Sequence, residues 1–205
     1  MFFILASSSP ARLQTLRNAG IDPLVIKPEV NESTVTAPGP ASLTAELARA
    51  KALDVAERIG NPEPWCLVAC DSMLELDQRA WGKPADAEAA TELWERMRGR
   101  AALLHTGHHV IVKDDKGLRE VNRVATTIVK FADLTGEEIA AYVATQEPVR
   151  VAGAFAIDGL GGAFITRIDG DPYNVVGISL PLVRQMLLDL GIKWHTLWNR
   201  ETNAR

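Results

Sequence analysis

The sequence predicts an α/β fold in which helices flank a mixed β-sheet. Apolar segments of strand length alternate with helical segments in the first half of the chain. Two longer segments, 103–112 and 120–131, then follow one another around the turn Asp114-Asp-Lys-Gly117 and predict an antiparallel hairpin. This hairpin excludes a purely parallel, doubly wound sheet. Because 47% of the 205 residues are apolar and 23% are charged, the chain has the composition of a globular protein with a core.

Local signals predict the individual elements. The apolar segment Phe2–Ala6 predicts a strand, and the Ser-Pro pair at residues 9–10 begins a helix that stops at Gly20. Segment 41–59 has apolar residues near helical period and is the clearest predicted helix. Segment 135–138, Thr-Gly-Glu-Glu, has the pattern of a capping box. The remaining segments predict strands at 23–26 and 65–70, helices at 86–97, 139–143 and 180–190, and a short strand within 159–168.

Charge and composition restrict the classes of partner. A net charge of −4 argues against broad binding to nucleic acid or acidic membranes, although a few basic residues are enough to bind one phosphate group. The opening apolar run is shorter than a signal sequence, and no segment approaches the roughly 20 apolar residues that span a bilayer. Cys66 and Cys70 lie in an apolar run, which is typical of small buried side chains. We therefore predict a cytoplasmic protein that binds neither nucleic acid nor membrane.

The turn Ser7-Ser-Ser-Pro-Ala-Arg12 contains the first candidate binding residues. A helix N-terminus offers unpaired N–H groups and the positive end of the helix dipole, and both attract anions. The hydroxyl of Ser7 adds a hydrogen-bond donor, and the planar guanidinium of Arg12 matches the geometry of a phosphate. The plain alternative is a helix cap beside a solvated arginine.

Two carboxylates are further candidates. Asp71 comes directly after the predicted strand 65–70, and α/β sheets present ligand-binding groups where their strands end. The alternative is an aspartate that caps a turn. Glu32 lies in an irregular loop, Val30-Asn-Glu-Ser33, whose sequence has no apolar periodicity to explain it.

Two lysines complete the set. Lys83 is held between Gly82 and Pro84, which restrict the backbone, and Lys51 borders the apolar stripe of helix 41–59, where lysines commonly extend to water. Cations that bind phosphates, together with two carboxylates that hold a divalent ion and orient water, fit phosphoryl chemistry. The sequence lacks the Gly-x-x-x-x-Gly-Lys-Ser/Thr pattern of P-loop enzymes.

Three histidines, His105, His108 and His109, lie close together in the sequence. Histidine clusters can bind zinc, but neighbouring strand residues point to opposite faces, and the chain contains no His-Glu-x-x-His pattern. A zinc site is therefore the minor alternative.

The motifs, taken in order, resemble those of the Maf family of nucleoside triphosphate pyrophosphatases. The resemblance extends from about residue 4 to residue 190, and its specificity comes from the ordered series rather than from any one motif. The matching segments are Leu5-Ala-Ser-Ser-Ser-Pro10 with Arg12, Glu32, Leu47-Ala-Arg-Ala-Lys51-Ala, Ala69-Cys-Asp71-Ser, Gly82-Lys83-Pro84, Ala152-Gly-Ala-Phe-Ala-Ile-Asp-Gly-Leu-Gly-Gly162, Asp169-Gly, and Asn174-Val-Val-Gly177 with Leu180-Pro-Leu182.

The resemblance implies a fold, an activity and an assembly. It implies two lobes on a long, curved mixed sheet with flanking helices and a central cleft, so that residues 1–205 form one unit with a tail at about 192–205. It implies hydrolysis of a nucleoside triphosphate to the monophosphate and pyrophosphate, with Mg²⁺ or Mn²⁺ as the cofactor. It also implies a homodimer.

The resemblance implies roles for particular residues as well. Asp71 would accept the proton of the attacking water, and Glu32 would act with Asp71 at the metal. The triphosphate would be held by Ser7, Arg12, Lys51 and Lys83, and Lys83 would also assist the reaction.

Departures from the family pattern fall at positions expected near the phosphates or the nucleobase. Many members have Ser-Pro-Arg-Arg where this chain has Ser9-Pro-Ala11-Arg12, so one arginine is missing. Members that act on dTTP and UTP usually have Thr and Gln at the positions of Ser72 and Asp158. An ionised Asp158 accepts hydrogen bonds but cannot donate them, whereas a Gln amide does both. We expect both residues to contact substrate, and we assign no pyrimidine specificity.

Two other functions use similar residues. A nucleotide-binding regulator of cell division or septum formation would need the phosphate site without turnover, and a nucleotidyltransferase would need an acceptor site as well. Hydrolysis is favoured, because a protein that only binds nucleotide has no need for a carboxylate that orients water beside cations that bind phosphates. The residues that support it are Asp71, Glu32, Lys51 and Lys83.

Overall fold

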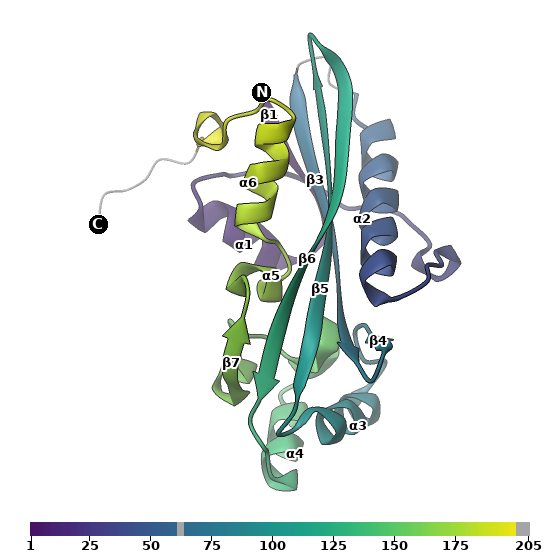
Figure 1. Ribbon diagram of the computed structural model, residues 1–205, viewed down its shortest axis with the longest axis vertical. Helices are drawn as coiled ribbons and strands as arrows, with labels where there is room; N and C mark the ends of the chain where they lie inside the picture. Colours follow the sequence, from purple (N-terminus) through teal and green to yellow (C-terminus); the bar gives the residue numbers. More distant parts are fainter. Residues whose placement is uncertain (61–63, 200–205) are drawn as a thin grey trace, which may run out of the picture.

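The structure, a computed structural model, describes residues 1–60 and 64–199 (Figure 1). Its framework is a mixed sheet with strands in the order β2-β1-β3-β5-β6-β7, and β4 pairs with β3 beside this row. β1 is parallel to β2 and β3, and the other pairs are antiparallel. The strands are β1 (Phe2–Ala6), β2 (Leu24–Ile26), β3 (Trp65–Leu76), β4 (Arg79–Trp81), β5 (Ala101–Asp114), β6 (Gly117–Phe131) and β7 (Ile165–Asp169).

Helices cover both faces of this sheet. In Figure 1, α2 lies on one side of the long strands, α6 lies on the other, and α3 and α4 lie at the far end of β5 and β6. The helices are α1 (Pro10–Asn18), α2 (Pro40–Glu57), α3 (Ala87–Met97), α4 (Gly136–Ala144), α5 (Pro172–Val176) and α6 (Leu180–Asp189). Short 3₁₀ turns lie at Glu32–Thr34, Pro148–Arg150, Ala152–Ala154, Leu160–Phe164 and Trp194–Leu197.

The first lobe buries apolar side chains on both faces of β3. Successive strand residues point to opposite faces, so Cys66, Val68 and Cys70 share a cluster with apolar residues of α1 and α6, while Leu67 and Ala69 share one with residues of α2. Burial raises the pKa of the Cys66 and Cys70 thiols to about 12, which keeps them neutral. Both cysteines are free, as the apolar pattern around them predicts.

The second lobe is built around one tryptophan. Trp94 of α3 is fully buried and makes edge-to-face contacts with Phe131, Tyr142 and Phe164. Its indole N–H donates to the carbonyl of Ala154 at 2.9 Å, which ties the apolar cluster to the 3₁₀ turn Ala152–Ala154. The predicted fold class is confirmed: two lobes share a long mixed sheet with flanking helices.

The predicted end of strand 65–70 is wrong. β3 continues to Leu76, so Asp71 lies inside a strand and not after one. The continuous apolar run stops at Cys70, but Leu74 and Leu76 are buried in period-2 alternation, and β5 pairs along this whole stretch. β4 and α5 were not expected from the sequence patterns. The other helices and strands were predicted and are confirmed, and the two hairpin strands β5 and β6 are longer than the predicted segments 103–112 and 120–131.

The edge of β3 has a gap where its neighbour changes. β1 pairs with β3 as far as Ala69, and β4 pairs with it from Leu74 onward. Between these two points, residues 70–73 have no neighbouring strand on this side within the described ranges. Side chains from both faces of β3 therefore reach one open space.

The last described segment packs on the body of the first lobe. Leu197 is buried with residues of α1 and α6, Trp198 contacts Gly20, and the N–H of Asn199 donates to the carbonyl of Gly20 at 3.2 Å. The rest of the predicted tail, residues 200–205, lies outside the described residues.

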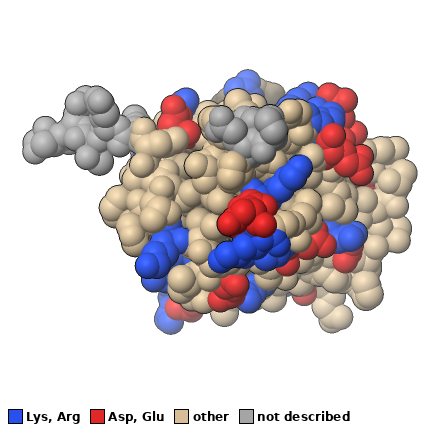
Figure 2. Space-filling model, turned by 90° about the horizontal axis from the view of Figure 1, so that it is seen from above, with Lys and Arg blue, Asp and Glu red and all other residues tan. Residues whose placement is uncertain are grey.

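The charged surface is mixed in sign. Figure 2 shows basic and acidic side chains interspersed on the face seen from above. Among the residues that the structure describes, no helix combines the length and the hydropathy needed to cross a bilayer.

A glycine of β5 sets how closely α2 approaches the sheet. Gly107 pairs with Asp71 in the sheet register, and a Cβ atom there would lie 2.1 Å from the carbonyl oxygen of Thr44 on α2. The missing side chain lets the helix backbone rest directly on β5. Lys51, further along α2, consequently lies within reach of Asp71.

We expect Gly107→Ala to lower the free energy of unfolding by about 1–3 kcal/mol, because the added methyl must push α2 away from the sheet. Urea denaturation measures this loss. The control is Gly136→Ala at the start of α4, where a Cβ has nothing within 4 Å. Equal stability of the Gly107 variant and the unmodified chain would contradict this account of α2.

Candidate functional site

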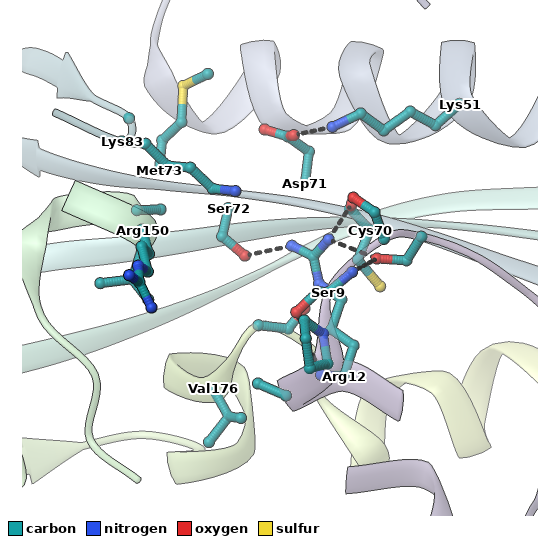
Figure 3. A pocket seen from close by; sticks show the side chains of 18 of the residues that line it. Ser9, Arg12, Lys51, Cys70, Asp71, Ser72, Met73, Lys83, Arg150 and Val176 are labelled. Atoms are coloured by element: carbon teal, nitrogen blue, oxygen red, sulfur yellow. Dashed lines mark hydrogen bonds and ion pairs between the residues drawn. The ribbon is translucent and has the colours of Figure 1, made fainter. Parts of the chain in front are cut away.

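A cavity of about 830 Å³ lies at the gap in the edge of β3 (Figure 3). Residues 70–73 of β3 line it, together with the turn before α1, the 3₁₀ turn after β2, α2, the β4–α3 loop and the segments 150–158 and 175–177. The structure brings all eight residues that the sequence predicts for the site to this cavity: Ser7, Arg12, Glu32, Lys51, Asp71, Ser72, Lys83 and Asp158.

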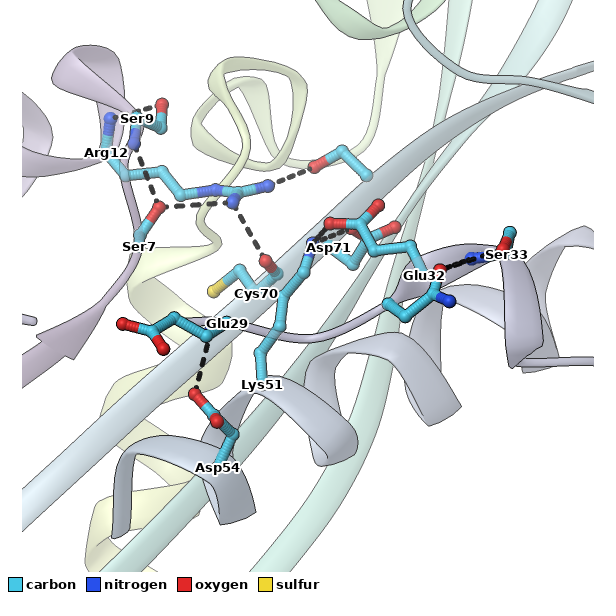
Figure 4. A network of polar contacts seen from close by, with 12 residues as sticks. Ser7, Ser9, Arg12, Glu29, Glu32, Ser33, Lys51, Asp54, Cys70 and Asp71 are labelled. Carbon is cyan, nitrogen blue, oxygen red and sulfur yellow. Dashed lines mark hydrogen bonds and ion pairs between the residues drawn. The ribbon is translucent and has the colours of Figure 1, made fainter. Parts of the chain in front are cut away.

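Lys51 bridges the two predicted carboxylates (Figure 4). Its Nζ lies 2.5 Å from Oδ1 of Asp71 and 2.8 Å from Oε1 of Glu32. The side chains of Lys51 and Asp71 are 11% and 9% exposed, whereas that of Glu32 is 55% exposed. Asp71 and Lys51 thus form a nearly buried ion pair, and Glu32 reaches it from the solvent side. Lys51 does not extend to water.

Asp71 keeps one oxygen free in this arrangement. Lys51 holds Oδ1, and Oδ2 has no hydrogen-bond partner among the described residues. Asp71 also lines the cavity. Its free oxygen is therefore available to a water, a metal ion or a substrate.

Arg12 connects three segments that are distant in the sequence. Its Nε donates to the carbonyl of Gly177 at 2.7 Å, and Nη1 donates to the carbonyl of Cys70 at 2.8 Å and to the hydroxyl of Ser7 at 3.4 Å. Its Nη2 donates to the hydroxyl of Ser72 at 3.0 Å. All these acceptors are uncharged, so the guanidinium is fixed in place while its positive charge has no carboxylate partner among the described residues.

The acceptors beyond Arg12 form a directed chain. The hydroxyl of Thr106 donates to the carbonyl of Asn174 at 3.1 Å, so its proton is not available to Ser72. The 2.9 Å contact between the Ser72 and Thr106 hydroxyls is therefore donated by Ser72. These hydrogen bonds attach the cavity wall at Ser72 to α5. The hydroxyl proton of Ser72 is donated to Thr106 in this arrangement.

Further basic residues line the cavity. Lys83, Arg150 and Lys27 line it, and the exposed Asp158 lies on the same lining. The sequence analysis missed Arg150 and Lys27. Lys27 follows β2, which is parallel to β1, so the strand-end rule that drew attention to Asp71 would have found it. No local pattern marks Arg150.

The donor set fits a hard divalent cation. Mg²⁺ prefers oxygen ligands and is usually held by one or two carboxylates together with substrate phosphates. Glu32 and Asp71 supply such carboxylates, and both lie in contact with the same atom, Nζ of Lys51. Within residues 1–60 and 64–199, no group of three or more His, Cys, Asp or Glu side chains is arranged to hold a metal alone. The set thus suits an ion that phosphates also ligate.

The three histidines of β5 do not converge. His105 contacts Glu75 and Thr126, and His109 contacts Glu120 on the same face. His108 points to the other face, where Nδ1 donates to the carbonyl of Thr106 and Nε2 accepts the N–H of Ser179, the N-cap of α6. The zinc alternative is therefore wrong for these residues.

Comparison with known proteins identifies the family. The family model described as Maf-like protein matches residues 2–190. The chain belongs to the Maf-like protein family. Similar proteins named nucleoside triphosphate pyrophosphatase occur in Cutibacterium acnes (55% identical, covering 96% of this chain and 94% of that protein), Streptomyces coelicolor (52%; 95% and 93%) and Thermosynechococcus vestitus (45%; 97% and 98%). The family resemblance expected from the ordered motifs is confirmed.

His108 makes the stability of this Maf-like chain depend on pH. Burial lowers the pKa of His108 to about 3 from 6.5, and the nearby positive charge of Arg12 acts in the same direction. Between these two values, the unfolded chain binds a proton here that the folded chain does not. The free energy of unfolding should therefore fall as pH falls below about 6.5, by up to about 1.4 kcal/mol per pH unit.

Urea denaturation of His108→Gln across the same pH range tests this expectation. The variant should show a shallower loss of stability toward acid than the unmodified chain, whereas His195→Gln, at an exposed histidine, should not. An unchanged slope in the His108 variant would contradict the role of its buried neutral imidazole.

Proposed function

We propose that this chain hydrolyses nucleoside triphosphates to nucleoside monophosphates and pyrophosphate. The observation that carries the proposal is the Lys51-bridged pair of carboxylates, Asp71 and Glu32, in a cavity whose other walls supply Arg12 and Lys83. Such a cavity can hold a polyanion and orient water beside it. The names of the similar proteins support the same activity.

Asp71 is the base in the proposed reaction. Lys51 fixes Oδ1, so Oδ2 accepts the proton as water attacks the α-phosphorus. The bond from that phosphorus to the oxygen bridging to the β-phosphate breaks, and pyrophosphate leaves with the bonding electrons. Ser7, Arg12, Lys51 and Lys83 hold the phosphates, and Lys83 also stabilises the charge that develops on the leaving group.

Glu32, with Asp71, holds the divalent cation, Mg²⁺ or Mn²⁺. When bound, this ion neutralises charge on the phosphates. The second oxygen of Glu32 has no hydrogen-bond or ion-pair partner within the described residues, which leaves it free for this ligation. Ser72 and Asp158 contact the substrate from the cavity lining.

We further propose that residues 1–205 form one catalytic unit of two lobes. We propose that this unit is cytoplasmic, on the sequence patterns, and a homodimer, on the resemblance to the family. The second candidate function, a nucleotide-binding regulator of cell division, is favoured only if the nucleotide binds without turnover.

Asp71→Asn tests the proposed base. We expect turnover to fall by at least about 10²-fold, because the amide cannot accept the proton, while nucleotide binding persists. Pyrophosphate release across canonical, deoxy and modified triphosphates, with Mg²⁺ or Mn²⁺, measures the loss and ranks the nucleobases.

Asp77→Asn is the matched control, because Asp77 is exposed, pairs with Arg100 and lies outside the cavity lining. Near-normal turnover of the Asp71 variant would sink the assignment of the base. Binding without turnover in the unmodified chain would favour the regulator.

Glu32→Gln tests the metal site. Removing one charged ligand should raise the Mg²⁺ concentration for half-maximal activity by roughly tenfold or more. A titration of Mg²⁺ after chelation measures this shift. Glu29→Gln serves as the control, since Glu29 is exposed and contacts Arg58 instead of Lys51. An unshifted titration for Glu32→Gln would remove Glu32 from the metal site.

A further inference from the structure

The backbone that carries Arg150 is fixed beside the cavity, which Arg150 lines. Arg150 ends the 3₁₀ turn Pro148–Arg150, and Glu147 just before it accepts hydrogen bonds from the Tyr142 hydroxyl and from the N–H groups of Leu160 and Gly161. These contacts fix the backbone that carries Arg150, although its own side chain is exposed.

The segment after Arg150 is joined to the loop that carries Lys83. The N–H of Gly153 donates to the carbonyl of Gly82 at 2.9 Å. Gly153 has a positive φ of 70°, and a Cβ there would lie 2.8 Å from the Cβ of Leu74 on β3. Arg150 and Lys83 therefore belong to one fixed part of the second lobe, and Figure 3 shows both on the side of the cavity away from Lys51.

Among the cations of the cavity that are named above, Lys51 alone is paired with carboxylates within the described residues. Lys51 has two carboxylate partners, at 2.5 and 2.8 Å. Neither Lys83 nor Arg150 has an ion-pair or hydrogen-bond partner for its side chain within residues 1–60 and 64–199, and both line the cavity. Two cations without a carboxylate partner thus extend from a fixed backbone and face one space.

We propose that Arg150, with Lys83, binds the terminal phosphates of the triphosphate and the pyrophosphate that leaves. This inference rests on the proposed function, which places the α-phosphorus beside Asp71 and the leaving pyrophosphate beside Lys83. The guanidinium donates two parallel hydrogen bonds to phosphate oxygens, which an ammonium cannot do. Because Arg150 contacts the leaving group, its charge also favours bond cleavage.

Calorimetry separates the phosphate role from the rest of the site. The probes are inorganic pyrophosphate and a nucleoside monophosphate, each with Mg²⁺. Arg150→Gln should weaken pyrophosphate binding by about tenfold or more, because a charge-assisted contact is lost, and change monophosphate binding by less than about twofold. Arg150→Lys should fall between Gln and Arg. Arg184→Gln, at an exposed arginine of α6 outside the cavity, is the matched control.

Steady-state kinetics on the same variants gives an independent readout. Arg150→Gln should raise the KM for the triphosphate by about tenfold or more, a loss that Lys83→Ala should share. Unchanged pyrophosphate binding, or equal weakening of both probes, would overturn the inference even with normal turnover in the unmodified chain. Pyrophosphate binding that depends on Arg150, in a chain without turnover, would support this anion site and overturn the proposed hydrolysis instead.

Discussion

The interrupted pairing along one edge of β3 is the constraint on which the site depends. A strand buried on both faces and paired on both edges offers no access to its side chains. Here β1 stops at Ala69 and β4 begins to pair at Leu74, so four consecutive residues open onto the cavity from both faces of one strand. Asp71 points toward α2 and Ser72 points toward Arg12, and the cavity reaches both.

The charged side chains on the two faces of β3 have different kinds of partner. On the α2 face, Lys51 and Asp71 form a nearly buried pair, and such pairs recover little of the cost of removing two charges from water. The close approach of α2 to Gly107 keeps Lys51 within contact distance of Asp71. On the other face, Arg12 is bound entirely by uncharged acceptors, one of which, the carbonyl of Cys70, lies at the open edge of β3. The same cation thus completes the hydrogen bonding of the strand edge and leaves a positive charge in the cavity.

The second lobe acts as a rigid support for the opposite wall. Edge-to-face contacts around Trp94 hold α3 and α4 together. The hydrogen bond from Trp94 to Ala154 also fixes segment 150–158, which lines the cavity. Electrostatic catalysis requires charges that are oriented before the substrate arrives, because reorientation during the reaction costs free energy. The packed aromatic core fixes the backbone from which the exposed side chains of Lys83 and Arg150 extend, and the proposed phosphate contacts would orient these charges.

The sequence by itself determined the elements whose signals are local: the Ser-Pro helix start before α1, the capping box of α4, the long hairpin and the family, which rests on short ordered motifs. It also determined which eight residues meet at the cavity. Only the tertiary structure decided that β3 continues past Asp71, that Lys51 is shared by two carboxylates and that Arg150 faces the cavity. The physical reason is distance along the chain. A cap or a turn is made by neighbours, whereas the contact of Arg12 with Gly177 joins residues 165 positions apart, and no local pattern encodes it.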